Sequence, residues 1–389
     1  MTSNVAGASV AHLSALVGFE TVSHRSNLDL IAYLEGVLQP LGARLQRIPD
    51  ASGQKANLLA SFGPTDRPGY ILSGHTDVVP VEGQSWSSPP FALTERAGKL
   101  LGRGTADMKG FLACCLAMAP KLAAAQLTAP VHIAFSYDEE VGCLGVRDLI
   151  AQLATWSVPP LGCIVGEPTG MHVVTSHKAK RAYRCVVTGT PGHSSRAPHF
   201  VNAVDVAAEF LVELRRLGRE VEESGPRDPL FDVPFTTTHV GLIRGGEALN
   251  IVPERCVFEF EFRALPSEDI DAMAAQMQRF ATQTLLPPMQ AISPEAGIEL
   301  ETLISYPGLD TAPDEDIVVL AKRLAGRNDH RKVAYGTEGG LFSKTGRVPT
   351  VVCGPGDIDR AHKADEYITR DELAACEGFL GALIDHLSQ

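Results

Sequence analysis

The chain has 389 residues, of which 44% are hydrophobic and 21% are charged, and its formal net charge is −12. This length exceeds that of one ordinary core and predicts two domains, or one large domain with an insertion. The acidic balance and the lack of a basic patch exclude a typical nucleic-acid-binding protein.

Three features of the sequence bear on where in the cell the protein is located. Residues 1–18 lack the basic segment and the long apolar core of a signal peptide. The most apolar helical candidate, 111–119, is followed by Pro120 and Lys121 and is too short to span a membrane. The eight cysteines form no CxxC pair, which is typical of buried, reduced thiols. We therefore expect a cytoplasmic protein without a membrane or nucleic-acid partner.

The first part of the chain alternates helices with strands. Residues 7–39 are expected to be helical, and strands are expected at 56–62 and 70–73. A second helix is expected from Met108 to about Ala119. A strand at 131–137, a helix at 146–153 and a strand at 161–165 follow. This alternation predicts a largely parallel α/β sheet, in which ligands bind beyond the carboxyl ends of the strands.

The pattern changes near residue 179. Strands are expected at 181–188, 236–243, 255–263 and 298–304, with helices at 201–217 and 267–283. Gly218 is expected to end the first of these helices and Ser267 to cap the second. The order βαββαβ is that of a ferredoxin-like module. We therefore expect 179–306 to be an inserted second domain.

After Pro307 the α/β pattern resumes. A helix at 316–324, a strand near Val333, a helix starting at Thr337, a strand at 348–353 and a helix at 371–387 are expected. Residues 1–178 and 307–389 therefore form the expected first domain, which contains a mostly parallel sheet.

Imidazole and carboxylate groups follow several of the predicted strands. His75 follows the strand that starts at Tyr70, Glu139 and Glu140 follow the next, and Glu167 follows a third. Two divalent ions held close together need such ligands, with one carboxylate bridging them. These strand ends share one edge of a parallel sheet. A metal site therefore explains the joint occurrence of these residues better than a set of unrelated solvated turns does.

Taken singly, these residues have ordinary alternatives. A His-x-Asp pair such as His75 and Asp77 is often structural in a turn. Asp107 could cap the helix that follows it. Consecutive acids are usually a solvated turn, and His362 lies in a loop rich in Gly and Pro.

Five short motifs stand out: Gly74-His75-Thr76-Asp77-Val78-Val79-Pro80, Gly104-Thr105-Ala106-Asp107-Met108-Lys109-Gly110, Asp138-Glu139-Glu140, Gly166-Glu167-Pro168-Thr169 and Gly192-His193-Ser194-Ser195. They resemble those of the di-zinc amidohydrolases, a family that includes acetylornithine deacetylases, succinyl-diaminopimelate desuccinylases, aminoacylases and glutamate carboxypeptidases. The resemblance extends over nearly the whole chain. It implies that 1–178 and 307–389 form a metal-binding catalytic domain and that 179–306 is a lid and dimerisation domain.

The resemblance implies a role for each metal-site residue. Asp107 would bridge two ions, with His75 and Glu167 completing one ligand set. Glu140 and His362 would complete the other. Zinc is the ion that the resemblance implies, although such ligands also accept cobalt or manganese.

The resemblance also implies the chemistry, which is hydrolysis of an amide. Asp77 would orient the ring of His75, and Glu139 would transfer protons as general acid and base. His193 would stabilise the tetrahedral oxyanion across a dimer contact. Without the resemblance, His193 reads as a surface residue of a turn.

The substrate residues are a further expectation. Asn250 and Arg263 resemble lid residues that grip a substrate carboxylate, although Arg263 could instead pair with Glu259 or Glu261. Gly336-Thr337-Glu338 resembles the acetylornithine deacetylase version of the family. We therefore expect release of acetate from N2-acetyl-L-ornithine, with Glu338 neutralising a substrate cation or, alternatively, serving as a first-turn helix acid.

A desuccinylase, a broader N-acyl-amino-acid amidohydrolase and a metallopeptidase remain alternative functions.

Overall fold

The computed structural model describes residues 5–388. Within it the chain forms two compact units. The first contains the residues up to Ser176, Leu309–Lys332 and the residues from Thr337 onward. The second contains His177–Gly308 and Val333–Gly336. The role of the second unit as a lid and dimerisation domain stays a prediction.

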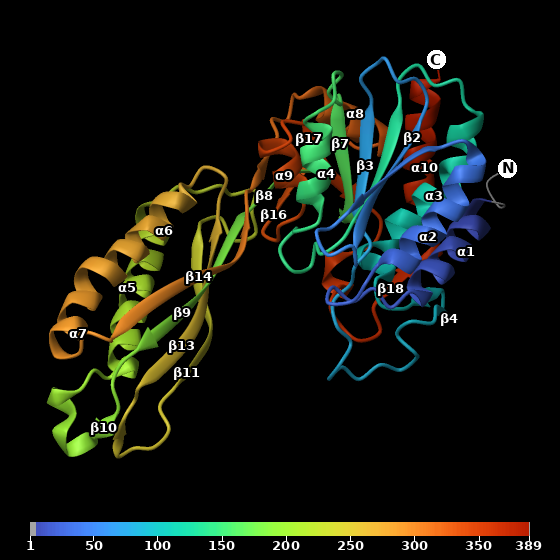
Figure 1. The fold of residues 1–389 in the computed structure, drawn as a ribbon. Helices are drawn as coiled ribbons and strands as arrows, with labels where there is room; N and C mark the ends of the chain where they lie inside the picture. The colour runs from blue at the N-terminus through green and yellow to red at the C-terminus, as the bar shows by residue number, and fades with distance from the viewer. Residues whose placement is uncertain (1–4, 389) are drawn as a thin grey trace. The chain divides into compact units, whose positions relative to one another are not determined.

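The first unit is built on a sheet whose central strands β6, β3, β7 and β17 run parallel (Figure 1). Antiparallel pairs flank them, for example β1 with β2 and β2 with β6. All side chains of β2 and β6 are buried, as expected for strands covered on both faces. The mostly parallel sheet is confirmed. The spatial order is β1 (Arg44–Pro49), β2 (Ala56–Phe62), β6 (Val131–Ser136), β3 (Tyr70–His75), β7 (Gly162–Pro168), β17 (Thr350–Gly354), β8 (Val174–His177) and β15 (Leu309–Asp310), with β16 (Arg331–Val333) beside β8.

Helices cover both faces of this sheet. In Figure 1, α3 and α10 lie on one face and α4 and α9 on the other. Leu13, Leu30, Phe111 and Leu380 belong to one continuous core that joins four helices to the strands. Within residues 5–388, no helix combines the length and the apolarity that crossing a membrane would need. The helices are α1 (Val5–Gly18), α2 (Leu28–Leu38), α3 (Gly110–Ala124), α4 (Val146–Leu153), α8 (Asp316–Leu324), α9 (Gly339–Lys344) and α10 (Arg370–Leu387), and a small sheet contains β4 (Thr94–Arg96), β5 (Lys99–Leu101) and β18 (Tyr367–Thr369).

Two helix predictions in this unit are wrong. The expected helix 7–39 is interrupted after α1, where Asn27 exchanges two hydrogen bonds with the backbone of Ala56 before α2 begins. The helix α3 continues through Pro120 to Ala124. Leu122 is 3% exposed in the core, so packing beyond Pro120 outweighs the loss of one helical hydrogen bond.

The second unit has a four-stranded antiparallel sheet in the order β11–β13–β9–β14, with α5, α6 and α7 on one face (Figure 1). This confirms the ferredoxin-like βαββαβ order. Phe258 and Phe260 of the sheet pack against Phe210 of α5, with ring centroids 5.1 and 5.4 Å apart. The bounds are β9 (Ala179–Thr188), α5 (Ala203–Ser224), β11 (Thr237–Gly245), β13 (Arg255–Ala264), α6 (Ile270–Arg279), α7 (Leu286–Ile292) and β14 (Gly297–Tyr306), with a short pair β10 (Gly192–His193) and β12 (Ile251–Val252).

Both helix boundaries predicted in this unit are wrong. Gly218 does not end α5, which continues to Ser224. A Cβ atom at Gly218 would lie 2.5 Å from Thr238 Oγ1, so the glycine lets the helix approach β11 closely. The cap of α6 is Asp269, whose side chain accepts a hydrogen bond from the Ala272 N–H at 2.9 Å, and not Ser267.

All eight cysteines lie within the described residues, and every one is buried with a free thiol. They act as small hydrophobic side chains, as the lack of a CxxC pair predicts.

Candidate metal centre

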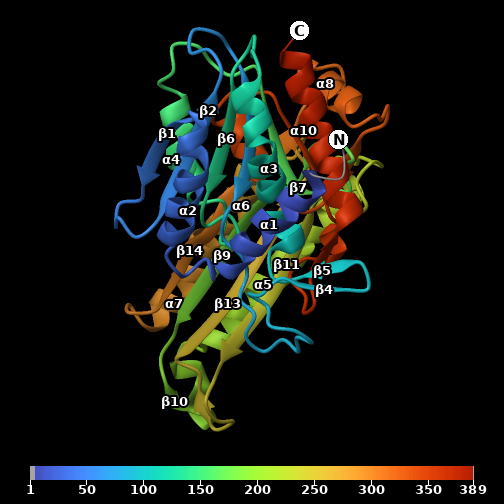
Figure 2. The same cartoon turned by 90° about the vertical axis from the view of Figure 1, so that its right-hand side faces the viewer.

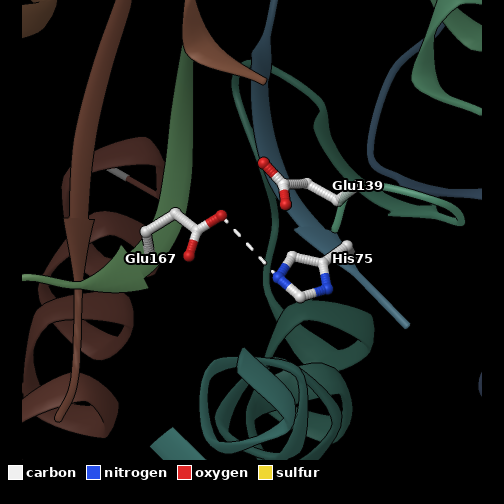
Figure 3. A group of neighbouring side chains, drawn as sticks. All are labelled: His75, Glu139 and Glu167. Atoms are coloured by element: carbon white, nitrogen blue, oxygen red, sulfur yellow. Dashed lines mark ion pairs between the residues drawn. The ribbon is translucent and has the colours of Figure 1, made fainter. Parts of the chain in front are cut away.

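Adjacent strands of the first unit bring imidazole and carboxylate groups together at one edge. His75 is the last residue of β3, and Glu167 lies near the end of β7. Glu139 and Glu140 follow β6. Because β6, β3 and β7 are parallel neighbours, their carboxyl ends lie side by side. Figure 3 shows the side chains of His75, Glu139 and Glu167 directed toward a common space.

Asp107 lies between two imidazoles. Its Oδ1 is 3.0 Å from His75 Nε2, and its Oδ2 is 3.3 Å from His362 Nε2. Glu140 Oε2 is 3.0 Å from the same His362 nitrogen, and Glu167 Oε1 is 3.7 Å from His75 Nε2 (dashed line in Figure 3). Each oxygen of Asp107 therefore faces a different half of the cluster, as a carboxylate bridging two ions would.

The spacing of these atoms fits divalent metal ions. Ligand atoms about 2.0–2.2 Å from a tetrahedral zinc ion lie roughly 3.3 Å from one another. His75, Asp107 and Glu140 offer ligand atoms that all lie within 4.8 Å of one another, and so do His75, Glu139 and Glu167. Imidazole with carboxylate is a donor set that several divalent metals accept. The geometry thus allows Glu139 to reach an ion as well as to handle protons.

The electrostatics of the cluster also favour bound cations. Burial raises the pKa of Glu139 to about 8 and that of Glu140 to about 7, and neighbouring carboxylates add to both shifts. Burial and the charge of Asp107 raise the pKa of Glu167 well above its usual value. Burial acts to raise the pKa of Asp107, but hydrogen bonds with the two imidazoles outweigh it and hold that pKa below its usual range. Several acids thus share one enclosed space, and divalent cations would relieve their repulsion.

The proposed ligands differ in exposure. His75, Asp107 and Glu167 are 1%, 6% and 5% exposed, whereas the side chain of His362 is 54% exposed. His362 enters from a loop after β17 with φ +61°. Packing therefore fixes three of the groups, while His362 depends on how its loop is anchored.

Asp77 lies behind the cluster but holds more than the ring of His75. The Nδ1 of His75 is 2.9 Å from the backbone oxygen of Asp77 and 3.5 Å from its carboxylate. The Asp77 carboxylate accepts hydrogen bonds from the N–H groups of Glu139 at 3.1 Å and Glu140 at 3.3 Å, and from the Ser23 hydroxyl at 2.7 Å. The support expected for His75 thus comes mainly from the backbone, and the carboxylate positions the pair of glutamates.

Two residues that no sequence motif singles out, Ser23 and Lys55, hold this loop. Ser23 binds Asp77, and Lys55 forms a half-buried ion pair with Asp138, which has φ +53°. No motif marks Ser23 or Lys55, because each acts through a partner that is distant in the sequence.

Glu338 was expected to contact a cationic group of the substrate, but its neighbours in the structure are two serine hydroxyls. It is 1% exposed and lies at the start of α9, where its carboxylate accepts hydrogen bonds from the hydroxyls of Ser73 and Ser136. Burial raises its pKa to about 7. These contacts place Glu338 against the ends of β3 and β6, and the alternative of an acid at a helix start agrees with its position.

His193 and Asn250 lie together in the second unit, and both are exposed. His193 pairs with Ile251 between β10 and β12, and the Ser194 N–H donates to the Asn250 oxygen at 3.1 Å. Figure 2 shows β10 at one end of β9 and β13. The Nδ1 of His193 accepts a hydrogen bond from the Ser195 N–H at 3.2 Å.

Arg263 lies in the four-stranded sheet, at the end of β13 that is remote from β12. Its Nε is 2.9 Å from Glu261 Oε1, so the ion pair considered as an alternative is present with Glu261, while Glu259 pairs with Arg184. At roughly 3.3 Å per residue, β13 spans about 26 Å between Arg255 and Arg263. One copy of the second unit therefore does not bring Arg263 together with the His193 and Asn250 pair.

The fold and the cluster define a two-unit α/β protein with a site suited to divalent metals. Residues 71–386 match the sequence model of the family described as Peptidase family M20/M25/M40. The chain is 34% identical to an acetylornithine deacetylase of Yersinia pseudotuberculosis over 371 residues, which cover 94% of this chain and 92% of that protein. These similarities show that the chain belongs to the M20 family.

Solved structures share the fold. A metallo-carboxypeptidase of this family from Sulfolobus solfataricus has a TM-score of 0.77 and 19% identity, covering 97% of this chain and 98% of its own. A dinuclear metal-binding peptidase from Bacillus subtilis has a TM-score of 0.67 and 14% identity, covering 99% of both chains. The family match and the 34% identity to an acetylornithine deacetylase identify the protein as an enzyme, an amidohydrolase of the M20 family.

Proposed function

We propose that this enzyme binds two divalent ions, zinc in the first instance, and removes the acetyl group from N2-acetyl-L-ornithine to give ornithine and acetate. The observation that carries the proposal is the position of Asp107, whose two oxygens face His75 and His362 separately. The similarity to acetylornithine deacetylases over most of the chain supports the choice of substrate. The reaction would serve arginine biosynthesis in the cytoplasm.

Distances within the cluster support the proposed ligand sets. His75 and Glu167 would hold one ion and Glu140 and His362 the other, with Asp107 shared. Such ions would lower the pKa of a bound water toward roughly 7 and polarise an acyl carbonyl.

Glu139 is the residue that we assign to proton transfer. It lies beside His75 and Glu167, and its backbone is fixed by Asp77. It takes the proton of the attacking water and returns it to the departing amine. Its raised pKa agrees with a group that can exist in both protonation states near neutral pH.

A homodimer is part of the proposal. His193 would donate a hydrogen bond to the oxyanion, while Asn250 and Arg263 would bind the substrate carboxylate. Because Arg263 lies about 26 Å along β13 from the end near β12, one copy cannot place all three on one amino acid. Two copies could, each supplying one end of its sheet.

The test is kcat/KM measured with bound metal quantified. The substrates are N2-acetyl-L-ornithine, N-succinyl-diaminopimelate, other N-acetyl amino acids and dipeptides with free amino termini. We expect a clear preference for N2-acetyl-L-ornithine and reversible loss of activity with a chelator. Preference for the succinyl compound would identify a desuccinylase, and a flat profile over acyl amino acids a broad amidohydrolase.

A dipeptidase or carboxypeptidase is the second candidate, because the structural neighbours include peptidases. Faster cleavage of dipeptides than of any acyl amino acid would favour it.

A further inference from the structure

Glu366 is a buried carboxylate to which the proposed chemistry gives no role. It is 1% exposed. Its Oε1 accepts hydrogen bonds from the N–H groups of Ala106 at 2.9 Å and Asp107 at 3.1 Å. Its Oε2 accepts from the Gly104 N–H at 3.1 Å and from the Arg103 guanidinium at 2.8 Å. One side chain therefore binds the backbone of the proposed bridging ligand and of two residues that precede it.

The backbone around Asp107 needs such an acceptor. Asp107 has φ −120° and ψ 93°, so the chain here departs from a helix before α3 begins. The Gly102 N–H also donates to the backbone oxygen of Glu366 at 2.9 Å. The segment 102–107 thus folds around Glu366, whose carboxylate takes the place of helical carbonyl acceptors.

A second branch leads from Glu366 to His362. Arg103 is 1% exposed, and it donates to the Lys363 oxygen at 3.3 Å and to the side-chain oxygen of Gln84. Gln84 in turn donates to the backbone oxygen of His362 at 2.8 Å. Since the His362 side chain is half exposed and its φ is positive, these bonds, rather than packing, hold its backbone.

We propose that Glu366, through Arg103 and Gln84, is a positioning residue that fixes Asp107 and His362 for the ion they share. This inference rests on the proposed two-ion site and adds a requirement to it. All four partners of the carboxylate are donors, so an amide would turn its NH2 toward one pair of them. His75 and Glu167 are held by β3 and β7, so their ion depends less on Glu366.

The test is a titration of metal-free protein with Co²⁺ against a competing chelator, with the absorption spectrum recorded at each step. Glu366→Gln should lower the affinity for the Co²⁺ ion at His362 by about 10- to 100-fold, the range for groups that orient metal ligands. The ion at His75 should change by a smaller factor. The control is Glu377→Gln, a 7% exposed glutamate on α10, for which both affinities should match the wild type.

Gln84→Ala is the second variant, because Gln84 is only partly buried and its loss leaves the Glu366 contacts in place. It should weaken the same ion by a smaller factor. Wild-type Co²⁺ affinities in Glu366→Gln would overturn the proposal, as would equal weakening of both ions. If Glu366→Gln does not fold, Gln84→Ala decides. Failure of the wild-type protein to bind Co²⁺ would instead contradict the proposed function.

Discussion

Replacing Asp77 by asparagine would separate two ways of supporting the site. The Asp77 carboxylate accepts from the N–H groups of Glu139 and Glu140, one on each oxygen. An asparagine has a single acceptor oxygen, so one of these buried N–H groups would face an NH2 group. An unmatched buried donor costs about 1–3 kcal/mol. Because 1.36 kcal/mol is a factor of ten, the upper part of this range predicts a loss of about a hundredfold in kcat.

The assay is kcat and KM of Asp77→Asn at saturating metal, with metal content measured on the same sample. We expect kcat to fall while both ions stay bound, since the lost hydrogen bond is one that positions Glu139 and its loop. Ser23→Ala is the matched control, because it removes one hydrogen bond to the same carboxylate but keeps both N–H contacts. Its expected loss is smaller, about tenfold, because it removes one hydrogen bond of roughly 1.5 kcal/mol and leaves neither N–H group unmatched. Loss of metal affinity with unchanged kcat per bound metal would show that Asp77 acts through His75 and would refute this reasoning.

Three further predictions test other parts of the molecule. Glu139→Gln should lower kcat by about 10²- to 10⁴-fold, the range for general acid–base groups, and near-normal turnover would contradict its role in proton transfer. His193→Ala should lower kcat by about a hundredfold or more with the metal retained, and an unchanged kcat would remove His193 from the oxyanion site. Gly218→Ala should lower the free energy of unfolding by about 1–3 kcal/mol in thermal or denaturant unfolding, because its Cβ would overlap Thr238. Its control is Gly378→Ala in α10, where a Cβ meets nothing within 4 Å and should stabilise by up to about 1 kcal/mol; equal effects of the two would contradict the packing explanation.

The buried strands and amphipathic helices could be predicted from the sequence because one local pattern determines each. Ala56–Phe62 and Val146–Leu153 have the bounds expected from apolar runs and helical spacing. The strand β1 (Arg44–Pro49) was not predicted, because it is an edge strand with mostly exposed side chains. Pro120 and Gly218 were misread as helix ends, since the contacts that keep those helices going come from distant segments.

The cluster of proposed metal ligands could be predicted because parallel strands end at a shared edge, which turns separate positions such as His75 and Glu167 into neighbours. The supporting contacts could not. Ser23, Lys55 and Glu366 each bind a partner that lies elsewhere in the chain, and their spacing carries no periodic signal.

The burial of every cysteine has a practical consequence for chemistry on this protein. Burial raises the pKa of thiols such as Cys115 and Cys143, and a maleimide reacts with an accessible thiolate. The native cysteines should therefore react slowly with such reagents. One cysteine introduced into each unit could then be labelled selectively, with little background labelling. Leu249, which is fully exposed, and Val319, at 54%, are suitable positions for a dye pair. Energy transfer between the two dyes would then show whether the distance between the two units changes when substrate is added.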